Sequence, residues 1–143
     1  MYRHILAAVE THEAGQTVLQ RARDLARQFG ARLSVVHVVE YLPVDPAGDA
    51  LLTTPVDLSR ERATQAEARL KEWCRQLEIP ADQARVAVGT ITAEILRAAR
   101  ESGADLIVVG HHPRRGLAAL FSHTEGGVVQ RSPCDVLAIR LNP

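Results

Sequence analysis

The segment Ala104–Gly110, which reads ADLIVVG, decides the fold of this chain. Its run of aliphatic residues stands between an aspartate and a glycine, which predicts a strand buried on both faces. Segment 32–40 (RLSVVHVVE) is also apolar on both faces, and segment 3–9 (RHILAAV) is a shorter run of the same kind. Strands of this composition are typical of parallel sheets that helices cover on both sides.

Helical periodicity separates these strands. Segment 14–29 repeats apolar residues at helical spacing, and Gly30 is expected to end that helix. Segment 41–57 is rich in proline and predicts a surface loop. A helix over 57–77 should follow, with Asp57 as its N-cap. The apolar stripe predicted for that helix consists of Ala66, Leu70, Trp73 and Leu77.

Strands and helices therefore alternate along the chain. The remaining predicted elements are strands over 84–88 and 134–140 and helices over 92–102 and 117–131. Thr90 or Thr92 is the expected cap of the first of these helices, and Gly103 is expected to end it. The alternation predicts an α/β fold, a single doubly wound five-stranded parallel sheet with helices on both faces. At 143 residues, one domain over 1–143 is expected.

Composition excludes several classes of protein. Apolar residues make up 46% of the chain and charged residues 24%, as in ordinary globular domains. The 17 basic residues balance 17 acidic ones, so no basic field is available to hold a nucleic acid. No apolar run is long enough to cross a membrane and no export signal is visible, so a cytoplasmic location is expected. Cys74 and Cys134 are then expected to be reduced thiols.

Two strand ends could carry chemistry, because ligands of such sheets bind beyond the carboxyl ends of the strands. Glu10 follows the first strand and could accept hydrogen bonds from an adenine or ribose, or help to hold a metal. Alternatively, it only favours the dipole of the following helix. Gly110, with Arg114 and Arg115 in the next loop, could hold a phosphate. The alternative is an ordinary solvated turn.

No catalytic or metal-binding set is predicted. His111 and His112 are adjacent and should point in different directions, and no acidic or cysteine ligands stand near them in sequence. His37 lies within a buried strand and is interpreted as a core histidine. Asp105 precedes its strand, at the edge of the sheet opposite to the usual ligand site, and is interpreted as structural. With no nucleophile–base motif, the chain is not expected to be an enzyme.

Four blocks of sequence resemble the universal stress protein family. They are HILAAVE (4–10), LSVVHV (33–38), GADLIVVGHH (103–112) and SPCDVLAIR (132–140), and the resemblance extends over the whole chain. It implies a Rossmann-like sheet of the adenine nucleotide alpha hydrolase type. It also implies a homodimer formed through the last strand, over 136–140.

The nucleotide-binding loop of that family is degenerate here. Its pattern is Gly-x2-Gly-x9-Gly-Ser/Thr, and this chain has Gly110, Pro113, His123 and Thr124 at those positions. Pro113 has no N–H to donate, and His123 places a ring where bare backbone would meet the phosphates. A shifted match that uses Gly116 is interpreted as coincidence. Weak or absent nucleotide binding is therefore expected.

The resemblance also implies the residues of a nucleotide pocket. The adenine would lie against Ala8, Val9, Glu10 and Val38. The phosphates would lie along Val109, Gly110, Thr124, Glu125 and Gly126, with Arg114 and Arg115. The implied function is that of a homodimeric, cytoplasmic stress-response regulator with unidentified protein partners. The alternative is a sensor that binds ATP or AMP, with slow ATP hydrolysis.

Overall fold

The computed structural model describes residues 1–40, 55–112 and 123–141. The elements follow one another in the predicted order. The strands are β1 (His4–Ala8), β2 (Arg32–Glu40), β3 (Ala84–Gly89), β4 (Leu106–His111) and β5 (Asp135–Arg140). The helices are α1 (Glu13–Phe29), α2 (Pro55–Gln76), α3 (Ile91–Ser102) and α5 (His123–Arg131), with a 3-10 turn at Ala81–Gln83.

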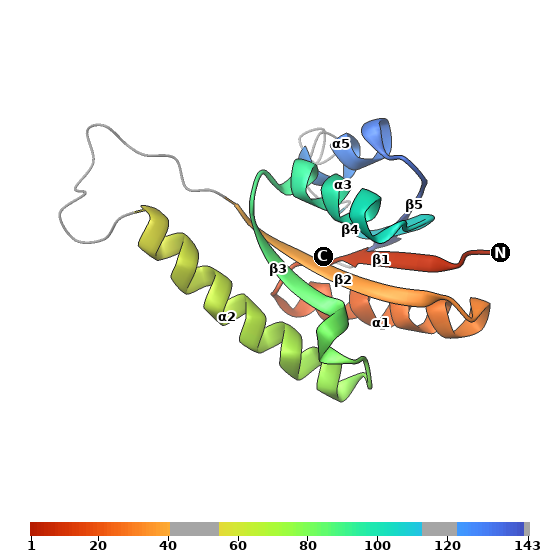
Figure 1. Ribbon diagram of the computed structural model, residues 1–143, viewed down its shortest axis with the longest axis horizontal. Coiled ribbons are helices and arrows are strands. Elements are labelled where there is room, and N and C mark those ends of the chain that lie inside the picture. Colours follow the sequence, from red (N-terminus) through yellow and green to blue (C-terminus); the bar gives the residue numbers. More distant parts are fainter. Residues whose placement is uncertain (41–54, 113–122, 142–143) are drawn as a thin grey trace.

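The strands form one parallel sheet in the order β3-β2-β1-β4-β5 (Figure 1). The chain moves outward from β1 to β2 and β3, then returns to the other side of β1 for β4 and β5. The strand order therefore reverses between β1 and β4. Ligands of open α/β sheets bind at such a switch point, beyond the carboxyl ends of the strands. The predicted fold class is confirmed.

Helices cover both faces of the sheet, which explains why its inner strands are apolar throughout. α1 and α2 lie on one face, and α3 and α5 lie on the other (Figure 1). Ile5 of β1 packs in the first layer and Leu6 in the second, because successive side chains of a strand point to opposite faces. Val108 and Ile107 of β4 divide in the same way. No helix within the described residues is long and apolar enough to cross a membrane.

The apolar stripe predicted on the second helix is confirmed. Ala66, Leu70, Trp73 and Leu77 are all buried, and Trp73 is only 6% exposed. Leu70, Trp73 and Leu77 pack in the same layer as α1. This stripe packs α2 against the sheet, so that the helix borders the carboxyl ends of the strands.

Three predicted helix ends are confirmed and one is corrected. Gly30 and Gly103 end α1 and α3 with φ values of 63° and 70°, a left-handed conformation that favours glycine. Thr90 is the N-cap residue of α3, although its side chain makes no capping hydrogen bond. The prediction that Asp57 caps α2 is wrong, because the helix already begins at Pro55. Proline suits the first helical position, where its fixed φ fits and its missing N–H has no helical partner to lose.

Asp105 has the structural role predicted for it. Its carboxylate accepts the backbone N–H of Arg3 at 2.9 Å and that of His4 at 3.0 Å, which joins the start of β1 to the start of β4. Hydrogen bonds from His4 and Arg3 lower the pKa of Asp105, because they stabilise the charged form. The two inner strands are thus held in register at the edge opposite to the expected ligand site.

Candidate functional site

The turn after β1 forms the centre of the carboxyl edge of the sheet. The N–H of Val9 donates to the carbonyl of Val36 at 2.9 Å, which extends the pairing of β1 and β2 beyond Ala8. The N–H of Gly15 then donates to the carbonyl of His12 at 2.8 Å as α1 begins. A Cβ at Gly15 would overlap the carbonyl oxygen of Glu10. Only glycine therefore lets α1 start this close to the end of β1.

The structure brings together the four residues predicted for the adenine. Ala8, Val9, Glu10 and Val38 all line one small cavity, which Ile91 of α3 and three other side chains complete. Its volume is about 60 Å³. Sites for small molecules usually have volumes of roughly 300–1,000 Å³. The residues are in place, but the cavity is far smaller than such a site.

A larger pocket of about 640 Å³ opens beside this cavity, between the strand ends and α2. Glu10 and His12 line it from the turn after β1, His37 and Val38 line it from β2, and Arg62 and Arg69 line it from α2. The sequence analysis did not identify the two arginines. Their separation by two helical turns places them on one face of α2, but only the packing of α2 shows that this face borders the strand ends.

His37 is bonded to the backbone, as expected of a core histidine, and it also lines the pocket. Its Nδ1 lies 2.7 Å from the carbonyl oxygen of Val9, so Nδ1 carries the proton of the neutral ring and donates it. Burial lowers the pKa of His37, which favours this neutral form. The ring therefore fixes the end of β1 against β2 while it borders the pocket.

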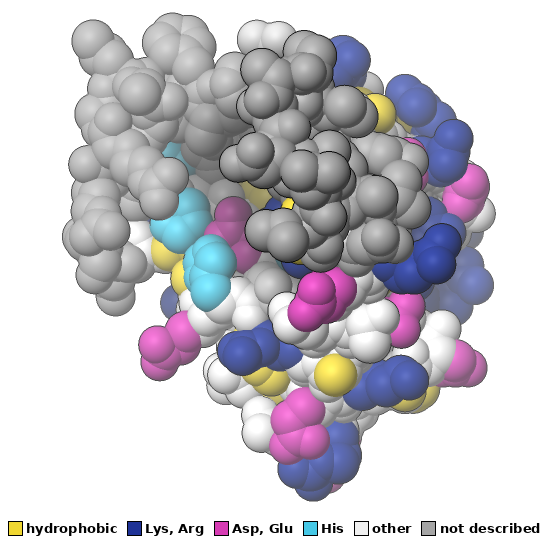
Figure 2. Space-filling view, turned by 90° about the vertical axis from the view of Figure 1, so that its left-hand side faces the viewer, with side chains coloured by type: hydrophobic (Ala, Val, Ile, Leu, Met, Phe, Trp, Pro, Cys, Tyr) yellow, Lys and Arg dark blue, Asp and Glu magenta, His cyan; other side chains and the backbone are white. Residues whose placement is uncertain are grey.

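Glu10, His12 and His112 form a cluster at this edge. The Oε2 atom of Glu10 contacts Nε2 of His12 and lies 3.4 Å from Nε2 of His112. The two imidazole rings are 6.0 Å apart between centroids. On the face formed by this edge, histidine side chains lie beside an acidic side chain (Figure 2). No acidic residue stands near the two adjacent histidines in sequence, but β1 and β4 are neighbours in the sheet, which brings Glu10 close to His112 in space.

Comparison with known proteins identifies the family of this chain. A family model described as the Universal stress protein family matches residues 1–140. The chain belongs to the universal stress protein family. It is 34% identical to universal stress protein A homolog 1 of Coxiella burnetii over 140 residues, which is 96% of each chain.

Solved structures of universal stress proteins share the fold. The universal stress protein UspA of Lactobacillus plantarum superimposes with a TM-score of 0.76 at 25% identity, over 97% of this chain and 98% of the other. A universal stress protein in complex with cAMP superimposes with a TM-score of 0.70 at 20% identity, over 97% of each chain. The latter likeness concerns the fold alone.

In this universal stress protein, Gly110 has a packing role. A Cβ at that position would lie 2.8 Å from Cδ1 of Leu141 and 3.2 Å from Cγ2 of Val18. The missing side chain therefore leaves room for α1 and the segment after β5. Val109, the other predicted residue of β4, is 2% exposed and packs in the layer of α3. Close packing explains this glycine without an approach of backbone to phosphate.

Most of the other residues predicted near the phosphates lie outside the residues, or the side chains, that the structure describes. Arg114, Arg115 and Pro113 lie outside the described residues. Thr124, Glu125 and Gly126 belong to the first turn of α5, which begins at His123, but their side chains are not described. The predicted helix over 117–131 is thus described only from His123 onward.

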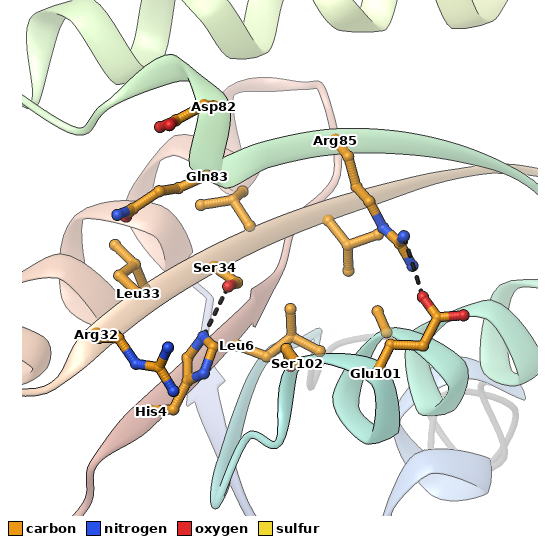
Figure 3. A pocket seen from close by; sticks show the side chains of 13 residues that line it. His4, Leu6, Arg32, Leu33, Ser34, Asp82, Gln83, Arg85, Glu101 and Ser102 are labelled. Atoms are coloured by element: carbon orange, nitrogen blue, oxygen red, sulfur yellow. Dashed lines mark hydrogen bonds and ion pairs between the residues drawn. The ribbon is translucent and has the colours of Figure 1, made fainter.

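A second pocket lies at the opposite, amino edge of the sheet and has a volume of about 400 Å³ (Figure 3). His4 contacts the hydroxyl of Ser34 there at 2.7 Å, and Arg85 pairs with Glu101 at 3.2 Å. Sequence analysis did not predict this hydroxyl–imidazole contact between neighbouring strands. Burial, and then the charge of Arg32, lowers the pKa of His4.

Among the described residues, no carboxylate accompanies the His4–Ser34 pair as the third group of a catalytic triad. A triad requires a carboxylate that orients the imidazole. The carboxylate of Asp105 accepts backbone N–H groups of Arg3 and His4 instead. The pair also lies at the edge where open α/β sheets do not bind their ligands. It is best explained as a hydrogen bond that joins β1 to β2.

Proposed function

We propose that this universal stress protein is a regulatory stress-response protein that acts through protein contacts, without catalysis, and holds adenine nucleotides only weakly. A cytoplasmic location is part of the proposal. One observation carries it: the cavity that all four predicted adenine residues line together measures only about 60 Å³, although Glu10 and Val38 also line the larger pocket. The degenerate loop, with Pro113 and His123 in place of two glycines, supports the same conclusion.

The walls of the adenine cavity explain why binding should be weak. Val36, Val38 and Ile95 are buried core residues, so they cannot move aside without disturbing the layer of α3. Ile91 is only partly buried, and it lines both this cavity and the larger pocket. A planar base would have to displace Ile91 to enter. Ile91 is therefore the residue whose truncation should join the two spaces.

Titration with ATP and with AMP, each with and without Mg²⁺, tests this proposal. The wild-type protein should bind with dissociation constants well above micromolar. Ile91→Ala should bind more tightly, and so should the double variant Pro113→Gly with His123→Gly, because each removes one of the obstacles. Val129→Ala, an exposed position on α5, is the matched control and should bind like the wild type. Failure of both sets of changes to increase the affinity would show that neither feature limits binding.

A nucleotide sensor is the second candidate. The pocket of about 640 Å³ has the volume of a ligand site, and Arg62 and Arg69 could pair with phosphates there. A relative with the same fold was solved with cAMP. This candidate requires micromolar affinity in the wild-type protein and a loss of affinity in Arg62→Ala. Slow hydrolysis would be detected as release of phosphate from ATP.

The proposal includes a homodimer formed through β5. Among the described strands, β5 pairs only with β4, so it forms an edge of the sheet. Leu137 is 37% exposed there, and Ala138 beside it is also exposed. An open apolar edge favours pairing with another strand, and a second copy about a two-fold axis is the simplest partner. Sedimentation velocity should detect a dimer, which Ala138→Pro should disrupt because proline removes an N–H. A wild-type monomer at micromolar concentrations would exclude this dimer.

A further inference from the structure

We propose that Glu10, His12 and His112 form a binding site for a Zn²⁺ ion at the carboxyl edge of the sheet. One carboxylate and two imidazoles match the ligand set of many three-ligand zinc sites, in which a fourth position stays open. The ligand atoms of all three residues lie within 4.8 Å of one another. The proposal does not depend on nucleotide binding.

The distances suit a tetrahedral ion. Ligand atoms bound to Zn²⁺ at about 2.0–2.2 Å in a tetrahedron are separated by about 3.3–3.6 Å. Oε2 of Glu10 and Nε2 of His112 are already 3.4 Å apart. The closer contact between Glu10 and His12 would be replaced by bonds from both side chains to the metal. Small rotations of exposed side chains are therefore enough to complete the site.

The backbone holds the three ligands in place. Glu10 and His12 belong to the turn after β1. The hydrogen bond from the N–H of Val9 and the close approach of Gly15 to Glu10 hold this turn against the end of β1. His112 directly follows β4, whose last carbonyl, that of His111, accepts the N–H of Leu141 at 2.8 Å. His12 occupies the N-cap position of α1, yet its side chain makes no capping hydrogen bond and contacts Glu10 instead. The side chain of His12 is thus directed toward the cluster.

Access and ligand type favour zinc over harder cations. The side chains of Glu10 and His12 are 58% and 57% exposed, and both residues line the pocket of about 640 Å³, so an ion can enter from solvent. Imidazole nitrogen suits Zn²⁺, whereas Mg²⁺ prefers oxygen ligands in a strict octahedral arrangement. The open fourth position would face water or a ligand in that pocket.

The experiment uses metal-free, untagged protein, since a histidine tag would itself bind zinc. Zn²⁺ alone, without nucleotide, is titrated by calorimetry, and Co²⁺ serves as a spectroscopic probe because tetrahedral Co²⁺ absorbs in the visible range. We expect one Zn²⁺ per chain, tetrahedral Co²⁺ bands, and no comparable binding of Mg²⁺. Loss of a group that only hydrogen-bonds to a metal ligand typically weakens metal binding about 10–100-fold. Loss of a ligand itself should have a larger effect, so His112→Ala and Glu10→Gln should each weaken Zn²⁺ binding by more than about 100-fold.

His111→Ala is the matched control. His111 is adjacent to His112 in sequence but is not part of the cluster, so this variant should bind Zn²⁺ like the wild type. Circular dichroism of each variant checks that the fold is retained. Three results would overturn the proposal: no Zn²⁺ binding by the wild-type protein, unchanged binding in folded His112→Ala and Glu10→Gln, or an equal loss in His111→Ala.

Discussion

Replacement of Gly15 by alanine tests how the carboxyl edge is built. A Cβ at this position would overlap the carbonyl oxygen of Glu10, a backbone atom that cannot rotate away. The first turn of α1 would have to move away from β1, which would also lengthen the hydrogen bond from the N–H of Gly15 to His12.

The expected size of the effect follows from three contributions. Overpacking of this kind typically costs about 1–3 kcal/mol, and a clash with backbone belongs at the upper end. A weakened hydrogen bond adds about 1 kcal/mol, and the better helix propensity of alanine offsets about 1 kcal/mol. The free energy of unfolding should therefore fall by about 3 kcal/mol, which lowers the melting temperature by roughly 6–12 °C in a domain of this size.

Gly30→Ala provides the matched control. Gly30 also has a backbone conformation that favours glycine, with a φ of 63°, but nothing lies within 4 Å of a Cβ built there. Its replacement should cost about 1–2 kcal/mol, from the left-handed conformation alone. Urea unfolding followed by the fluorescence of Trp73, the one tryptophan of the chain, measures both variants. Equal destabilisation by Gly15→Ala and Gly30→Ala would refute the proposed close approach of α1 to β1.

Three further predictions concern the core and its titration. Trp73 should show blue-shifted native fluorescence that moves to the red on unfolding, and a native spectrum like that of free tryptophan would contradict its burial between α2 and the sheet. Leu70→Ala should lower the free energy of unfolding by about 2–5 kcal/mol, whereas Val129→Ala, 59% exposed, should change it by less than about 0.5 kcal/mol in the same urea titration. Burial lowers the pKa of both His4 and His37. Once the pH falls below the ordinary histidine pKa, the unfolded chain therefore binds more protons than the folded protein. The free energy of unfolding should then decrease as the pH is lowered from about 7.5 to about 5.5, and a rise over that interval would contradict the assignment.

The sequence predicted the fold well because its signals are local. Runs such as 32–40 and 106–109 are apolar on both faces, and the observed β2 has the bounds that were predicted. The glycines that end α1 and α3 are equally local signals. The start of α2 was missed by two residues, because Pro55 was interpreted as part of the loop rather than as the first helical residue.

The candidate site was predicted only in part, because it depends on contacts between distant segments. Ala8, Val9, Glu10 and Val38 do line one cavity, but its volume also depends on residues of other segments that line it, such as Ile91 of α3. The cluster of Glu10 with His112 arises from the pairing of β1 with β4, which residue spacing cannot show. Leu141 and Val18 also give Gly110 a packing role that its place in the sequence could not show, and its contact with phosphate stays a prediction.

The nucleotide content of the purified protein tests the central claim most directly. The untagged wild-type chain is isolated from its expression host, dialysed, denatured and examined by mass spectrometry for released nucleotides. Since the adenine cavity measures about 60 Å³, we predict that far less than one ATP or AMP is recovered per chain. Recovery of close to one equivalent of either nucleotide would contradict the account and identify the protein as a nucleotide-binding member of its family.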